Sequence, residues 1–180
     1  MNGEASYLKT KKLVTLSLFL GIGVVLYIAE LFYFPPLPIP GAKLGLVNIV
    51  TLVLLAFYRW QDSLFNVIVR TLAGSLVTGT LLTPPFFFSL TGALSSFIVM
   101  LLVYRKFYGK FSFVGVSLSG SIVHNLSQLL LARLFIGHWG VLFQTPFLIL
   151  IAIPTGAFNG VVANYVVKRL GSLAWRPSET

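Results

Sequence analysis

The segment GSIVHNLSQLLLARL, residues 120–134, places His124, Asn125 and Gln128 inside one of the longest apolar stretches of the chain. An imidazole and two carboxamides donate and accept hydrogen bonds, so they suit the binding of a polar small molecule. Catalysis has little support, because the sequence offers no carboxylate pair, no cysteine and no glycine-rich nucleotide motif. His124 and His138 are too few and too far apart for a metal site. We therefore expect no catalytic residue, no metal and no cofactor.

Three further polar residues fall near the middle of other apolar segments, namely Asn48, Arg70 and Asn159. At about 1.5 Å per residue, their depth in a bilayer matches that of His124. Ionisable groups at that depth cost several kcal/mol in lipid, so these side chains should face the interior of a helix bundle. Gln128 follows His124 by four residues and shares its helix face. Two interpretations stay open: a layer of hydrogen bonds between helices, and the polar lining of a ligand cavity.

Carboxylates are scarce, and only Glu30 falls within an apolar segment. Counting residues places Glu30 roughly 15 Å from Arg70 along the bilayer normal, so we expect these two not to pair. Glu30 is better matched in depth to Lys43 or Arg133, although Arg133 can alternatively extend to the outer headgroups. Arg70 is then expected to lack a carboxylate partner and to bind an anionic or carbonyl-rich group of a ligand.

The composition indicates that these residues lie in a membrane protein and not in a soluble one. The 180 residues are 57% hydrophobic and 9% charged, with a mean hydropathy of +0.92, whereas soluble domains are about 25% charged. The net charge of +9 comes from basic residues at the ends of apolar runs, which is typical of a membrane protein and argues against nucleic-acid binding. Cysteine is absent, which excludes disulfides and thiolate metal sites.

Six apolar segments predict an all-α, multi-pass protein of the cytoplasmic membrane in a single domain, residues 1–180. Ten of the 13 Lys and Arg residues lie on the side of the N-terminus, so both termini are expected in the cytoplasm. The proline-rich segment 35–41 cannot form regular helix and is expected to be a mobile outer lid. The predicted spans are Leu13–Phe34, Lys43–Tyr58, Ser63–Leu82, Phe86–Tyr104, Val114–Ile136 and Pro146–Lys168.

Three stretches together carry a resemblance: PPLPIPGAKLGLVNIVTLVLL, RTLAGSLVTGTLLTPPFFFSLTGALSSFIVMLL and GVSLSGSIVHNLSQLLLARL. They resemble the Gx transporter family, also labelled heptaprenyl diphosphate synthase component I, over roughly Leu13 to Leu170. That family is similar to the substrate-binding S components of energy-coupling-factor (ECF) transporters, which are six-helix bundles with both termini inside. The resemblance implies capture of a vitamin-like molecule from outside, and assembly with a coupling membrane protein and two ATPase subunits. Such components often dock through small residues of the first helix, for which Ser17 and Gly21 are the nearest equivalents here.

We therefore predict a substrate-binding transport component for a small vitamin-like or prenyl- or quinone-related molecule. An enzyme is not expected, because prenyl diphosphate synthases need aspartate-rich motifs and the only aspartate here is Asp62. The alternative is a non-transporting membrane partner that recruits a prenyl diphosphate synthase or redox enzyme through the basic segment YRKFYGKF, residues 104–111. The expected ligand-binding residues are Lys43, Asn48, Arg70, His124, Asn125, Gln128 and Asn159.

Overall fold

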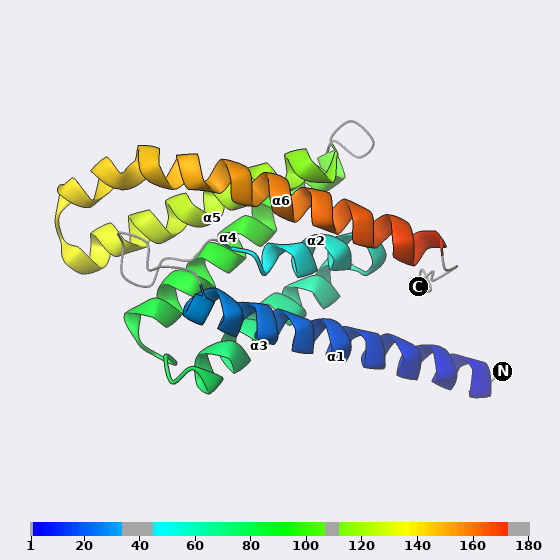
Figure 1. Ribbon diagram of the computed structural model, residues 1–180. Helices are drawn as coiled ribbons and strands as arrows, with labels where there is room; N and C mark the ends of the chain where they lie inside the picture. The colour runs from blue at the N-terminus through cyan, green and yellow to red at the C-terminus, as the bar shows by residue number, and fades with distance from the viewer. Residues whose placement is uncertain (1, 34–44, 107–111, 173–180) are drawn as a thin grey trace.

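The computed structural model describes residues 2–33, 45–106 and 112–172, and their secondary structure is helical, which confirms the predicted all-α class. Figure 1 shows long helices lying roughly side by side around one short central helix. In chain order they are α1 (Asn2–Tyr33), α2 (Asn48–Phe57), α3 (Trp60–Val77), α4 (Pro84–Lys106), α5 (Phe113–Ile136), the 3-10 helix η1 (Trp139–Gln144) and α6 (Thr145–Ser172).

Four helical segments of the described residues are long and apolar enough to cross a membrane: Ser6–Phe32, Pro84–Lys106, Phe113–Ile136 and Trp139–Gly171. They correspond to the first, fourth, fifth and sixth predicted spans. The second predicted span is reduced to α2, whose ten residues reach about 15 Å, half of a bilayer's hydrocarbon core. The third, α3, carries Asp62 in its first turn and the buried Arg70 near its centre. The structure is therefore a multi-pass membrane protein with four clear candidate spans.

Local chemistry explains where several helices begin and end. The predicted second span starts at residue 43, yet α2 begins at Asn48, because Gly45 adopts a left-handed backbone with φ of 80° just before it. The third was predicted to reach residue 82, but α3 ends at Val77 and a turn follows at Gly79, where φ is 68°. Glycine reaches this conformation at no steric cost, so both positions interrupt helix.

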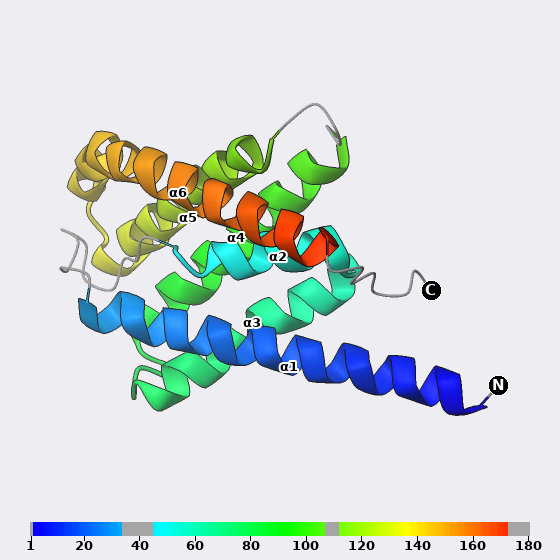
Figure 2. The same ribbon diagram turned by 45° about the vertical axis from the view of Figure 1, so that its right-hand side comes forward.

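α2 lies at the centre of the bundle and contacts every other α-helix. Seven of its ten residues are buried, and Leu52 and Val53 pack with Phe97 and Met100 of α4 in the main apolar core. Figures 1 and 2 show α4, α5 and α6 packed along one side of α2, with α1 and α3 on the other. Apart from Asn48 and Thr51 the helix is apolar, so its hydropathy resembles that of a membrane span.

α1 and α3 run in the same direction and pack closely through glycine. A Cβ at Gly74 of α3 would strike the ring of Tyr27, and one at Gly23 of α1 would lie 3.0 Å from Cδ of Arg70. At the N-terminal end of this pair, Nζ of Lys12 lies 2.7 Å from Oδ2 of Asp62. These contacts fix the register of the two helices, with Gly23 opposite Arg70.

Candidate binding site

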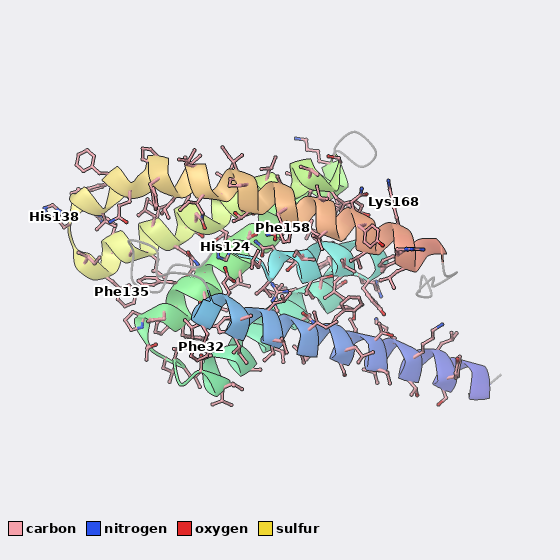
Figure 3. The ribbon with its side chains drawn as sticks, in the orientation of Figure 1. Phe32, His124, Phe135, His138, Phe158 and Lys168 are labelled. Carbon is pink, nitrogen blue, oxygen red and sulfur yellow. The ribbon has the colours of Figure 1, made fainter. Side chains whose placement is uncertain are left out.

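Five helices and the turn before α2 enclose a cavity near the middle of the bundle, here called the central cavity. Its volume is ≈ 20 Å³, which is room for about one water molecule. Figure 3 shows His124 midway between His138 at one end of the molecule and Lys168 at the other. The lining residues are Tyr27 and Glu30 of α1, Gly45 and Val47 of the turn, Asn48 of α2, Arg70 and Thr71 of α3, Ser89 and Ala93 of α4, and His124 of α5.

Arg70 is the only guanidinium among the residues that line the central cavity. Its side chain is 2% exposed, and its stem packs against Gly23, where α1 has no side chain to exclude it. Nη2 donates to Oγ1 of Thr51 at 2.8 Å. Nη1 is buried and has no hydrogen-bond partner among the described residues. The guanidinium is therefore held at one nitrogen and retains donor capacity at the other.

Glu30 lines the same cavity as Arg70, and this corrects the sequence-based expectation. The carboxylate is 4% exposed, lies near enough to interact electrostatically with Arg70, and accepts a hydrogen bond from the Gly45 N–H. The expectation failed because it placed each helix independently along the bilayer normal. With Gly23 opposite Arg70, Glu30 is seven residues further along α1, about 10 Å, and two long side chains span most of that separation.

Gly45 connects three helices through its backbone. Its N–H donates to Glu30 of α1. Its carbonyl accepts from Nδ2 of Asn159 on α6 and from the Asn48 N–H of α2, both at 3.0 Å. A Cβ at this position would lie 3.1 Å from Nδ2 of Asn48 and 3.5 Å from the His124 ring. Asn159, predicted as a ligand contact, is thus bound to the turn that closes the cavity. Nδ2 of Asn48 is buried in the cavity wall, with no hydrogen-bond partner in the part of the chain that the structure describes.

His124 and Gln128 form a pair on one face of α5, as their spacing predicts. Their Nε2 atoms lie 2.9 Å apart, and His124 is 5% and Gln128 1% exposed. Gly92 of α4 faces both, since a Cβ there would lie 2.8 Å from Cε1 of His124 and 3.0 Å from Nε2 of Gln128. The imidazole therefore reaches the cavity, while the carboxamide behind it fixes the orientation of the ring.

The remaining predicted site residues lie elsewhere. Asn125 donates from Nδ2 to the Leu148 carbonyl at 3.1 Å and so connects α5 to α6. Lys43 and the proline segment 35–41 lie outside the described residues. Arg133 lies at the far end of α5, where Cζ is 3.8 Å from the centroid of a Trp139 ring.

Sequence reasoning missed the contribution of α1 to the cavity. Tyr27 is 3% exposed and its hydroxyl lies 3.4 Å from Oγ of Ser89. Gly23, Tyr27 and Glu30 follow one another at helical spacing, and that period is the signal that could have identified this face. Ser17 and Gly21 lie on the opposite, exposed side of α1, and nothing stands within 4 Å of a Cβ built at Gly21.

Comparison with known proteins returns one finding. The family model described as heptaprenyl diphosphate synthase component I matches residues 19–166, a range that contains every residue lining the central cavity. No curated protein and no solved structure matches the chain. Within the described residues, no group of three or more His, Cys, Asp or Glu side chains is arranged to hold a metal ion.

Proposed function

The chain belongs to the heptaprenyl diphosphate synthase component I family, and we propose that it acts as the membrane-embedded substrate-binding component of a transporter. The ligand is a small vitamin-like or prenyl- or quinone-related molecule, bound by Arg70, Asn48 and His124 in the central cavity. In this proposal the chain carries out no chemistry of its own. Its one aspartate, Asp62, is engaged with Lys12, which leaves no aspartate-rich motif to hold magnesium and diphosphate.

One observation supports this proposal above the others: two buried donors of the central cavity lack a partner. Nη1 of Arg70 and Nδ2 of Asn48 are both buried and unbonded within the described residues, and both residues line the cavity. Buried polar atoms are nearly always hydrogen-bonded, so an exception needs an explanation. A ligand with hydrogen-bond acceptors would satisfy both of these atoms.

Glu30 changes the ligand chemistry that the site favours. Arg70 and Glu30 together carry no net charge, so the cavity needs no anionic ligand to neutralise Arg70. A neutral carbonyl group accepts from the guanidinium and the carboxamide without facing repulsion from Glu30. We therefore propose a carbonyl-rich or zwitterionic head group, and the apolar side chains of the bundle would contact its body.

Binding requires the cavity to widen, because small-molecule sites usually occupy about 300–1,000 Å³ and this one measures ≈ 20 Å³. α1 is the helix best suited to move. It packs chiefly against α3 and only slightly against α2, and it supplies Tyr27 and Glu30 to the cavity wall. Displacing α1 would break the bonds to Ser89 and Gly45 and open the cavity from one side.

Transport also requires partners, and here the proposal follows the resemblance to ECF transporters. A coupling membrane protein would dock on the exposed face of α1 around Ser17 and Gly21, and two ATPase subunits would drive the module. Small residues allow close approach between helices in a membrane. The exposed apolar side chains beside them on α1, among them Leu13, Leu18 and Val25, would otherwise face lipid.

The test is native mass spectrometry of the protein extracted gently from its own membrane. We expect a bound small molecule, and we expect Arg70→Lys to weaken its retention by about 1–3 kcal/mol, the value of a charge-assisted hydrogen bond. Arg133→Lys is the matched control, since it makes the same exchange outside the cavity. His124→Ala should weaken retention less than Arg70→Lys. Equal retention by Arg70→Lys and Arg133→Lys would contradict a ligand site at Arg70.

A second candidate function is recruitment of a soluble prenyl diphosphate synthase or redox enzyme to the membrane. The description of the family favours it, and Tyr104, Arg105 and Lys106 would begin the contact surface at the end of α4. Affinity purification from the native membrane separates the two proposals. Co-purifying ATPase subunits favour the transporter, whereas a co-purifying synthase favours recruitment.

A further inference from the structure

A second cavity, here called the basic-end cavity, lies at the end of the bundle where α1 begins and α6 ends. Its volume is ≈ 230 Å³, far larger than the central cavity. It is formed by the connection between α2 and α3 and by the last turns of α4, and Figure 2 shows these elements at the same end as the start of α1 and the end of α6. The lining residues are Leu55, Tyr58, Arg59, Trp60, Gln61, Leu101, Tyr104 and Arg105.

The charge of this cavity is positive. Arg59 enters from the α2–α3 connection and Arg105 from the end of α4, so two guanidiniums from separate parts of the chain meet at one cavity. No Asp or Glu is among the residues that line it. The nearest carboxylate in sequence, Asp62, forms an ion pair with Lys12 and also interacts electrostatically with Tyr58 of the lining. Two guanidiniums without a carboxylate in the lining make the wall of this cavity positive, which favours an anionic ligand.

The remaining lining residues suit an amphiphilic ligand at a membrane interface. Tyr58, Trp60 and Tyr104 supply aromatic rings with polar edges, a type enriched where headgroups meet hydrocarbon. Leu55 and Leu101 provide an apolar wall beside them. Guanidinium groups bind phosphate through two parallel hydrogen bonds, which is why arginine is preferred where phosphate is recognised.

We propose that the basic-end cavity binds a phosphate group, with Arg59 and Arg105 as its ligands. The volume suits a head group better than a complete cofactor, for which sites are commonly larger. The phosphate would come either from a membrane lipid or from a soluble phosphate compound, and the chemistry at the two arginines is the same. This proposal does not depend on the central cavity or on transport.

The experiment measures binding to the purified full-length chain in neutral detergent at fixed ionic strength. The probes are dioctanoyl phosphatidic acid, dioctanoyl phosphatidylcholine and inorganic diphosphate. We expect the Arg59→Gln, Arg105→Gln double variant to bind phosphatidic acid about tenfold more weakly or worse. The control is Lys168→Gln with Arg169→Gln, which removes the same charge from exposed positions of α6 at this end, and it should change binding less than about twofold.

Each result has a fixed meaning. Phosphatidic acid bound in preference to inorganic diphosphate identifies a lipid phosphate, and the reverse preference identifies a soluble one. Equal loss in the double variant and the control would show that only the overall positive charge attracts the probe, and this would overturn the proposal. Unchanged binding in the double variant would overturn it as well. All four substituted residues are exposed, and a thermal melt of each variant verifies folding.

Discussion

Arg70 and Glu30 are buried groups of opposite charge that line one cavity and interact electrostatically, so removing one of them should cost more than removing both. We expect Glu30→Gln and Arg70→Met each to lower the free energy of unfolding by about 3–5 kcal/mol, because each leaves an uncompensated buried charge. The double variant should recover most of that loss. The measurement is a double-mutant cycle by denaturant unfolding in mixed micelles. If the loss in the double variant equals the sum of the losses in the two single variants, the charges do not interact.

At the same scale, the sequence predicted some members of the site and not others. Arg70, Asn48 and His124 do line one cavity, because a polar group in the middle of an apolar helix must face the protein interior. Glu30 was matched in depth to Lys43 or Arg133 instead of Arg70, because the offset between α1 and α3 is decided by the packing of Gly23 and Gly74, which depth counting does not include. Asn125 was misplaced for a related reason: it is adjacent to His124 in sequence, and adjacent residues on a helix point in different directions.

At the scale of elements, glycine determines how closely helices pack. A Cβ at Gly160 of α6 would overlap the backbone of Val114 on α5, and backbone cannot move aside as a side chain can. We expect Gly160→Ala to destabilise the protein by about 1–3 kcal/mol through separation of α5 and α6. Gly21→Ala is the control, since its added methyl group meets nothing within 4 Å. Thermal unfolding in detergent measures both, and similar melting temperatures would contradict the proposed packing.

The elements themselves were predictable to different degrees. The long helices α1, α4, α5 and α6 follow from hydropathy, since each is a continuous apolar run of sufficient length. The second predicted span, Lys43–Tyr58, contains only ten helical residues in α2, because hydropathy does not show where the helix begins within an apolar run. The left-handed turn at Gly45 and the burial of seven residues of α2 are properties of the folded chain.

For the whole molecule, the absence of cysteine allows a direct test of orientation. His138 and Lys168 lie at opposite ends of the structure (Figure 3), and basic residues favour the cytoplasmic side. We expect Lys168→Cys to react with a membrane-impermeant maleimide only in inverted vesicles, and His138→Cys only in intact cells. Labelling of both variants from the same side would contradict a bundle that crosses the membrane between these two positions.

The conformation and contacts of Gly45 limit which single-base changes its codon can tolerate. Every single-base change of a glycine codon that alters the amino acid introduces a side chain: alanine, serine, valine, aspartate, glutamate, arginine, cysteine or tryptophan. At Gly45 each of these meets a φ of 80° together with Asn48 and His124, whereas at Gly137, where φ is 73°, nothing lies within 4 Å. In a library of all single-base variants selected for function, missense codons at position 45 should be depleted more than those at position 137. Codon 45 should tolerate little besides synonymous change.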